Sequence, residues 1–393
     1  MNEIADFFNR RKTLRPFEPV LIEFCESLSQ ALFDYPKIRT YPDIVALAFW
    51  LRKGHLEDLR AAFLQEQGNE FLTPRGIVFH IAPANVETMF VYSWILALLT
   101  GNANIVRLPT KDNENLKILF DVIRKILKEP HFKQILDSTL LLSYGHDEAM
   151  TAALSAHADM RILWGGDETI RTLRRIPIPP FAKEIVFPDR FAFAAFYSEA
   201  FLSATEDEKQ NVIKNLYNDI YWYDQLACSS PKVCVWVGTK EQDAEASAEV
   251  YNKLQKLVRE KRYTLSLGLA LQKETYLYSM ALELPHMDVQ RFSNELTVVK
   301  LNQFDDKCRQ HCGSGLLYHL EVENLSHLGE MIGAQDQTLV YYGFEKQILY
   351  KFARELNGKG LVNIVPVGQA LNFDYLWDGY NLLAELTKCI QIK

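Results

Sequence analysis

One cysteine lies in a sequence setting that suits nucleophilic chemistry. Cys228 belongs to the run 222–231, where polar side chains surround the thiol and neither helical nor strand periodicity continues. A thiol on a loop between two regular elements is held by a rigid scaffold yet stays accessible, as catalytic residues often are. Free cysteines are more commonly small buried hydrophobes. Cys234 fits that description, because it falls within an apolar strand pattern.

A helix and a strand are predicted on the two sides of this loop. Thr205 and Glu208 have the spacing of a capping box, and apolar residues then recur at helical spacing up to residue 220. After the loop, residues 232–237 are mostly β-branched or aromatic and end at Gly238. We therefore expect Cys228 on a helix-to-strand connection. A thiol with an ordinary pKa of ~8.5 is mostly protonated at neutral pH, so the site must favour the thiolate.

The preceding part of the chain alternates between strand-like and helix-like patterns. Strands are predicted at 76–81, 104–108, 140–143 and 160–164, and helices at 86–99, 116–127 and 148–157. Such alternation predicts a mostly parallel sheet covered by helices, with ligands at the carboxyl ends of its strands. We expect an α/β fold with two doubly wound lobes. The expected parts are a helical region over 1–70, a dinucleotide-binding domain over 71–199 that 361–393 could complete, and a catalytic domain over 200–360.

Glycine turns beside the predicted strands indicate a nucleotide cofactor. Gly101, Gly145 and the pair Gly165-Gly166 follow one another in register, although none forms a G-x-G-x-x-G motif and any one alone is an ordinary turn. Glycine lets backbone N–H groups approach a pyrophosphate closely. Arg107 and Lys111 add two cations where no carboxylate occurs. A basic group suits a ribose 2′-phosphate, so NADP is favoured over NAD, with a solvated basic turn as the alternative.

Composition excludes several other classes of protein. With 43 basic and 50 acidic residues the net charge is −7, which argues against a nucleic-acid partner. Six scattered cysteines suit reduced thiols, and the first residues lack the features of a secretory signal, so we expect a cytoplasmic protein. The most apolar window, 89–99, is too short to span a bilayer. We expect no metal site, because Cys308 and Cys312 lack a second ligand pair.

Several motifs resemble those of the aldehyde dehydrogenase superfamily. Residues 76–86 include Pro83-Ala-Asn85, and an apolar helix then leads to Gly101-Asn102. Within that superfamily the chain is similar to acyl-CoA reductases of the LuxC type over about residues 70 to 390. The matching runs are 225–231, 337–343, 365–368 and 377–379. The resemblance implies an aldehyde dehydrogenase-like fold with a cofactor-binding lobe and a catalytic lobe.

The resemblance also implies roles for individual residues. Cys228 would be the nucleophile and Asn85 the side-chain donor to the oxyanion. Gly145, Trp164, Gly165 and Gly166 would line the dinucleotide site, with Arg107 or Lys111 at the adenosine ribose. The implied reaction is NADPH-dependent reduction of an acyl thioester, on CoA or a carrier, to an aldehyde through an acyl-cysteine. An acyl-protein synthetase or acyltransferase is an implied partner, and a homo-oligomer is expected.

One departure from the superfamily pattern bears on the reaction. Aldehyde dehydrogenases carry a glutamate that activates the water for hydrolysis of the acyl-enzyme. Here Pro188 falls near that position, and Glu184 is the nearest glutamate. Without this base an acyl-cysteine persists long enough to be reduced, as a thioester reductase requires. The alternatives are an NAD(P)-dependent aldehyde dehydrogenase that oxidises an aldehyde, and a subunit that carries acyl groups without reducing them.

Overall fold

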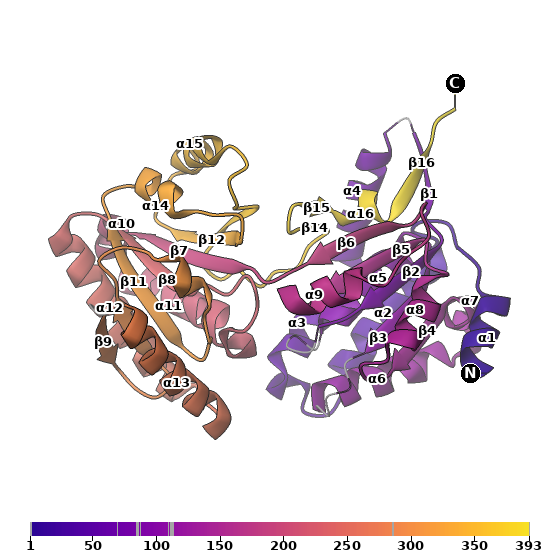
Figure 1. Cartoon of the computed structure of the whole chain (residues 1–393), viewed down its shortest axis with the longest axis horizontal. Coiled ribbons are helices and arrows are strands. Elements are labelled where there is room, and N and C mark those ends of the chain that lie inside the picture. Colours follow the sequence, from indigo (N-terminus) through magenta and orange to yellow (C-terminus); the bar gives the residue numbers. More distant parts are fainter. Residues whose placement is uncertain are drawn as a thin grey trace. The chain divides into compact units, whose positions relative to one another are not determined.

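A computed structural model describes residues 2–68, 70–83, 86, 88–108, 110, 114–284 and 287–392. The chain forms two compact units, one from Met1–Asp189 with Phe373–Lys393, the other from Arg190–Asn372. Each unit is built around its own mostly parallel sheet (Figure 1). The alternation of strand and helix patterns in the sequence predicts this architecture.

The first unit holds a five-stranded sheet in the order β4-β3-β2-β5-β6, with every pairing parallel. Its strands are β2 (Ile77–Ile81), β3 (Ala103–Leu108), β4 (Thr139–Ser143), β5 (Met160–Trp164) and β6 (Lys183–Phe187). The four strands predicted before residue 165 are confirmed, and β6 adds a fifth.

The order of strands reverses beside β2. From β2 the chain moves outward through β3 and β4, and then returns to place β5 on the opposite side of β2. In an open parallel sheet such a reversal leaves a crevice beyond the carboxyl ends of the two strands, where ligands bind. These ends are Ile81 and Trp164. The crevice therefore borders the glycine pair that the sequence assigns to a dinucleotide.

Helices cover both faces of this sheet (Figure 1). One core holds Val78 with α2 (Pro19–Phe33), α3 (Pro42–Trp50), α4 (Lys53–Gln67), α5 (Met89–Leu99), α6 (Glu114–Leu127) and α7 (Lys133–Asp137). The opposite core holds Ile77 and Phe79 with α1 (Asn2–Arg10), α8 (Glu148–Ser155) and α9 (Asp167–Arg174). The N-terminal helices thus share their core with the sheet. No helix among the described residues has the length and apolarity needed to cross a membrane.

The chain returns to the first unit at Phe373. The returning segment contains β14 (Leu376–Trp377), β15 (Tyr380–Asn381), α16 (Leu382–Glu385) and β16 (Thr387–Ile390), which pairs with β1 (Phe71–Pro74). Trp50 Nε1 donates to the Phe373 carbonyl at 3.0 Å, and Asn102 Nδ2 donates to the Leu386 carbonyl at 3.0 Å. These bonds attach the tail to the core of the first unit.

The second unit holds a seven-stranded sheet in the order β13-β12-β7-β8-β11-β10-β9, in which β9 is antiparallel to β10. The strands are β7 (Phe191–Tyr197), β8 (Val233–Val237), β9 (Asp288–Arg291), β10 (Thr297–Lys300), β11 (Leu316–Val322), β12 (Asp336–Tyr342) and β13 (Asn363–Pro366). One face packs on α10 (Ser198–Ser203), α11 (Glu206–Tyr221) and α12 (Lys240–Glu260). The other packs on α13 (Leu267–Glu283), α14 (Leu325–Met331) and α15 (Lys346–Leu356).

The motif at residues 365–368 has a structural role in this second unit. The Gly368 N–H donates to Asp219 at 2.6 Å, and the Ala370 N–H donates to the same carboxylate at 3.1 Å. Gly368 has φ of 95°, and a Cβ there would lie 2.7 Å from Asn215. Glycine is therefore required where the chain turns back after β13.

Candidate active site

Cys228 lies on the predicted connection, between α11 and β8. The capping box at the start of α11 is confirmed, since Thr205 and Glu208 exchange both hydrogen bonds. The helix ends at Tyr221, and a short 3-10 turn over Trp222–Gln225 leads into the loop. The loop joins the amino end of β8, which lies between β7 and β11 in the sheet. The candidate nucleophile is thereby attached to the middle of the second unit.

Three consecutive residues before Cys228 hold a strained backbone. Tyr223, Asp224 and Gln225 have φ of 55°, 53° and 63°. Residues other than glycine rarely adopt this left-handed region. Each such residue costs about 1–3 kcal/mol and persists only where its surroundings impose it, and such residues cluster at functional sites. The strained backbone therefore indicates that this loop is part of a functional site.

The side chain of Gln225 holds the strained loop in place. Its Nε2 donates to the carbonyls of Pro231 and Leu316 at 2.8 and 2.9 Å. Its Oε1 accepts from the Gly315 N–H at 3.0 Å. The buried amide therefore ties the residues on both sides of Cys228 to the start of β11.

A second loop, residues 313–315, packs against the same strained segment. The Ser314 N–H donates to the Asp224 carbonyl at 2.8 Å, and the Tyr263 hydroxyl donates to the Asp224 carboxylate at 2.5 Å. Gly313 has φ of 69°, and a Cβ there would lie 2.7 Å from the Asp224 carbonyl oxygen. Close approach of the two loops therefore requires glycine at this position.

Cys228 differs from the other cysteines in its exposure. It is half-buried, whereas Cys25, Cys234, Cys308 and Cys312 are buried and Cys389 is exposed. Burial raises the pKa of both the Cys234 and the Cys312 thiols to about 12, so these two stay protonated at neutral pH. The prediction that Cys234 is a core residue of the strand is confirmed. Partial exposure in a polar loop is the setting of a reactive thiol.

Lys232 is a buried cation next to this loop and is not among the site residues predicted from the sequence. The side chain is 7% exposed. Its Nζ donates to the carbonyls of Ala227 and Ser230 at 3.0 and 2.7 Å, and lies 5.9 Å from the centre of the Phe191 ring. Burial lowers the pKa of Lys232 to about 8, and the charge of Cys228 acts in the opposite direction. The sequence signal for this residue is a lysine placed directly before the apolar strand Val233–Val237.

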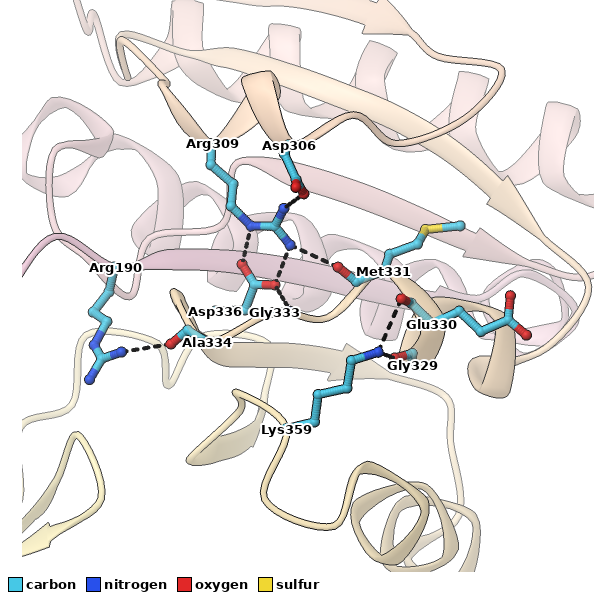
Figure 2. A network of polar contacts seen from close by, with 10 residues as sticks. All are labelled: Arg190, Asp306, Arg309, Gly329, Glu330, Met331, Gly333, Ala334, Asp336 and Lys359. Atoms are coloured by element: carbon cyan, nitrogen blue, oxygen red, sulfur yellow. Dashed lines mark hydrogen bonds and ion pairs between the residues drawn. The ribbon is translucent and has the colours of Figure 1, made fainter.

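A loop that carries Arg309 and His311 lies close to Lys232. Figure 2 shows a bidentate ion pair between Arg309 and Asp336. The Asp336 carboxylate accepts from Arg309 Nε at 2.9 Å and from Nη2 at 2.6 Å. Nη2 also donates to the Met331 carbonyl at 2.8 Å. The Asp336 side chain is 0% exposed, so the loop is fixed to the start of β12 by a buried ion pair. Burial lowers the pKa of His311, and the charge of Lys232 lowers it further.

In the first unit, Trp164 ends β5 at the crevice beside β2. Its ring stacks on Phe187 with centroids 3.8 Å apart, and it is 7% exposed. Its Nε1 donates to Ser93 Oγ at 3.2 Å. The Trp164 side chain is therefore fixed at the carboxyl end of β5 by stacking on Phe187 and by its hydrogen bond to Ser93.

Behind Trp164 lies a chain of buried polar side chains. His80 Nδ1 lies 2.8 Å from Ser93 Oγ, and His80 Nε2 lies 3.1 Å from Asn104 Oδ1. Burial lowers the pKa of His80 to about 4. With the proton on Nε2, His80 donates to Asn104 and accepts from Ser93, so every partner is satisfied. His80 is a neutral structural residue.

Gly165 and Gly166 lead directly into α9. A Cβ on Gly166 would lie 3.1 Å from the Asp189 carboxylate, which also accepts from the Asp167 N–H at 3.1 Å. The first turn of α9 carries Asp167 and Glu168. Carboxylates at a helix N-terminus stabilise the helix and suit hydroxyl groups better than phosphate. The N-terminus of α9 beside the glycine pair is therefore acidic, whereas a pyrophosphate-binding turn offers free N–H groups and no carboxylates.

Arg107 and Gly145 are brought together at the carboxyl ends of β3 and β4. Arg107 Nη2 donates to the Gly145 carbonyl at 2.8 Å, and the guanidinium lies over the Tyr144 ring at 4.7 Å. A Cβ on Gly145 would meet no atom within 4 Å, so packing does not require glycine there. Asn85 and Lys111 lie outside the described residues.

Glu184 is occupied by two arginines. Its carboxylate accepts from Arg161 Nε at 2.6 Å and lies 3.2 Å from Arg174 Nε. Arg161 is almost fully buried, at 1% exposed. This ion pair connects β5 to β6, which pair in parallel. A carboxylate held in this way stabilises the sheet and is poorly suited to activate water.

Breaking this pair is expected to destabilise the protein strongly. Arg161→Met leaves the largely buried Glu184 carboxylate without its closest partner, at a cost of about 3 kcal/mol. Arg171→Met is the matched control, because Arg171 pairs with Asp167 and Glu168 at the surface, where such pairs contribute less than about 1 kcal/mol. Urea denaturation measures both changes, and equal losses in the two variants would contradict the structural role of Glu184.

The residues considered for metal binding belong to a hydrophobic cluster. Cys308 and Cys312 lie in the core under α13, and burial raises the pKa of both thiols. Among the described residues, no group of three or more His, Cys, Asp or Glu side chains is placed to hold a metal ion.

Sequence comparison connects the chain to one family. A family profile described as "Acyl-CoA reductase (LuxC)" matches residues 54–389. A long-chain acyl-protein thioester reductase of Aliivibrio fischeri is 28% identical over 167 residues, which are 42% of this chain and 33% of the relative. Another from Photorhabdus laumondii is 22% identical over 313 residues, 75% of this chain and 60% of the relative. The match thus spans between a third and three fifths of these relatives.

Structural comparison identifies the fold. Methylmalonate-semialdehyde dehydrogenase from Oceanimonas doudoroffii aligns with a TM-score of 0.71 at 13% identity, over 99% of this chain and 88% of that chain. Glyceraldehyde-3-phosphate dehydrogenase from Methanocaldococcus jannaschii, solved with NADP, aligns with a TM-score of 0.66 at 14% identity, over 94% and 87%. The expected aldehyde dehydrogenase-like fold is confirmed.

Proposed function

Because the chain belongs to the LuxC-type acyl-CoA reductase family, we propose that it reduces an acyl thioester to an aldehyde with NADPH. The observation that carries the proposal is the loop of Cys228. A half-buried thiol follows three strained residues and adjoins a buried lysine. Strain and a buried cation are costly, and a mere connection between a helix and a strand needs neither.

Cys228 acts as the nucleophile on the acyl carbonyl. Its sulfur forms a bond to the acyl carbon, and the bond from that carbon to the donor sulfur breaks. The donor leaves as a thiolate that takes up a proton. NADPH, when bound, supplies the hydride that reduces the acyl group. The bond to Cys228 then breaks, the aldehyde is released, and the thiolate is regenerated.

Asn85 is proposed to donate a hydrogen bond to the oxyanion formed by this attack, together with the backbone N–H of Cys228. Losing one oxyanion donor typically lowers turnover by about 10²–10³-fold. We expect Asn85→Ala to show such a loss in aldehyde formation, with its melting temperature unchanged. Asn102→Ala is an informative contrast, because Asn102 bonds to the Leu386 carbonyl in the core and its loss should lower stability instead. Equal turnover in Asn85→Ala and wild type would show that Asn85 is not a donor to the oxyanion.

The pairing of Glu184 with two arginines favours reduction over hydrolysis. In an oxidising aldehyde dehydrogenase a free glutamate must activate water to release the acid. Glu184 is engaged by Arg161 and Arg174, and Pro188 stands near the superfamily position of that base. An acyl-cysteine without a base to hydrolyse it persists until it is reduced. For this reason we favour thioester reduction over oxidation of an aldehyde as the function of this chain.

The first unit is proposed to hold NADPH, in preference to NADH. The reversal of strand order beside β2 supplies a crevice, and Trp164, Gly165 and Gly166 border it at the end of β5. Gly145 is unconstrained by packing and lies beside Arg107. Such a glycine leaves room for a ligand beside the Arg107 guanidinium, where phosphates fit, while the acidic first turn of α9 suits the hydroxyl groups of a dinucleotide. Arg107 or Lys111 would read the ribose 2′-phosphate.

The acyl donor is proposed to be acyl-CoA or an acyl group carried on a protein. The two relatives are named for acyl-protein thioesters, which supports a carrier or an acyl-protein synthetase or acyltransferase as partner. A cytoplasmic homo-oligomer is proposed on the family resemblance alone.

The proposal is tested by offering the purified protein NADPH with acyl-CoAs from short to long chain. Loss of NADPH with formation of an equal amount of aldehyde supports the reductase. An acyl adduct on the protein without NADPH loss, found by mass spectrometry, would replace it with an acyl-carrier role. Acid formation from free aldehyde with NADP⁺, and no reaction with thioesters, would replace it with the oxidising activity.

A further inference from the structure

Lys232 needs a compensating anion. An ammonium in a buried position costs several kcal/mol unless it is hydrogen-bonded and paired. The carbonyls of Ala227 and Ser230 satisfy two of its three N–H groups, but carbonyls carry no net charge. Burial lowers the pKa of Lys232 and the charge of Cys228 opposes this, which leaves the pKa at about 8, so the side chain is still protonated at neutral pH.

The groups that face Lys232 come from three elements. Phe191, at the start of β7, presents its ring. His311, on the loop fixed by Arg309, is kept neutral because burial and the charge of Lys232 both lower its pKa. The Cys228 thiol comes from the nucleophile loop, and its charge stabilises the ammonium. Of these three groups Cys228 can carry the matching negative charge, and it lies in the chain between the two carbonyls that bind the ammonium.

The chain geometry keeps this pair together. Ala227 and Ser230 flank Cys228 in sequence, so the lysine binds the loop on both sides of the thiol. The backbone of Lys232 is fixed as well, because its N–H donates to the Ala192 carbonyl and its carbonyl accepts from the Tyr318 N–H, both at 2.9 Å. The backbone of Lys232 is thus anchored to the sheet, and its ammonium to the Cys228 loop.

We propose that Lys232 is a positioning residue that keeps Cys228 ionised, its anchored ammonium stabilising the thiolate that attacks the acyl carbonyl. The lysine forms no bond to the substrate and transfers no proton to it. The inference rests on the proposed role of Cys228 as the nucleophile. It supplies the source of thiolate stabilisation that the sequence leaves open.

The test is the pH dependence of Cys228 alkylation by iodoacetamide, followed by mass spectrometry of the peptide that contains it. A neighbouring opposite charge typically moves such a midpoint by about 1–3 pH units. We expect a wild-type midpoint below that of a free thiol at ~8.5. In Lys232→Met the midpoint should rise by about one pH unit or more, so that alkylation at pH 7 slows about tenfold. Lys232→Arg should restore most of the rate.

Lys273→Met is the matched control. Lys273 is also buried, at 2% exposed, and donates to the carbonyls of Ser314 at 3.1 Å and of Asn294. It holds the neighbouring loop, and Cys312 is the thiol that acts on its pKa. Its removal should leave the Cys228 midpoint unchanged. The same shift in both variants would mean that any disturbance of the loops produces it, and would overturn the proposal.

Two further results would also overturn the proposal. One is an unchanged midpoint in folded Lys232→Met. The other is a wild-type midpoint at or above that of a free thiol, which needs no variant to fold. Alkylation requires neither acyl donor nor NADPH. A failed reductase assay with a shifted midpoint would therefore reject the proposed function alone, and a working reductase with an ordinary midpoint would reject the role of Lys232 alone.

Discussion

Replacing Cys228 with alanine is expected to abolish covalent acylation and aldehyde formation together. The second unit offers no equivalent thiol among its described residues, since Cys234, Cys308 and Cys312 are all buried and burial raises the pKa of each. Loss of a catalytic nucleophile typically lowers turnover by on the order of 10⁴-fold or more. The alanine lacks only a sulfur at a half-buried position, so the melting temperature should change little.

The measurement is single-turnover acylation by mass spectrometry, with NADPH oxidation followed in parallel. Cys389→Ser is the control, because Cys389 is exposed in β16 of the first unit and should remain dispensable. If Cys228→Ala still forms aldehyde at a comparable rate, hydride reaches the acyl donor directly and the acyl-cysteine is not an intermediate. If the variant still becomes acylated, another residue is the acceptor.

The position of Cys228 could be predicted because local patterns determine it. The capping box at Thr205 and Glu208 and the helical spacing that follows are properties of neighbouring residues, as is the β-branched run in β8. Strands β2, β3, β4 and β5 of the first unit follow from the same periodicities. Their alternation with helices predicts a parallel sheet with ligands at the carboxyl ends of its strands, whereas the reversal of strand order beside β2 depends on how the strands pair.

The features that shape the site could not be predicted, because they depend on contacts between distant residues. Gln225 is fixed by the Leu316 carbonyl, 91 positions along the chain. The ion pair of Glu184 with Arg161 appears only when β5 and β6 lie side by side. Lys232 at the head of a strand is typical of a solvated position, and its burial depends on Phe191 and the loop of His311.

The acidic first turn of α9 has a related explanation. Gly165 and Gly166 have the composition of a phosphate-binding turn and are predicted to be one from the sequence. In the structure Asp189, after β6, reaches the Asp167 N–H that such a turn would offer to phosphate. Because β6 was not among the predicted strands, the position of Asp189 beside α9 could not be foreseen.

The strained loop makes Gln225 the residue whose replacement should disturb both stability and catalysis. Gln225→Leu keeps the volume but leaves the carbonyls of Pro231 and Leu316 and the N–H of Gly315 without their buried partner. Each orphaned group costs about 1–3 kcal/mol, so a loss of about 3 kcal/mol or more is expected in urea denaturation. Released from its anchor, the loop should also relax from the left-handed conformation.

Relaxation of the loop should displace Cys228, and a displacement of about 1 Å at a reacting group can cost about 10²-fold in turnover. Gln225→Glu tests the donor alone, because its carboxylate can accept from the Gly315 N–H but would face the two carbonyl oxygens without a hydrogen bond. A buried unpaired carboxylate is costly, so this variant should be at least as unstable as Gln225→Leu at neutral pH. Gln210→Leu is the control, since Gln210 is exposed on α11 and its side chain donates to Glu206 one turn away. Normal turnover by a Gln225→Leu protein that is measurably less stable would mean that the strained conformation is not needed for the reaction. The left-handed run would then serve only to let the chain pass from α11 into β8.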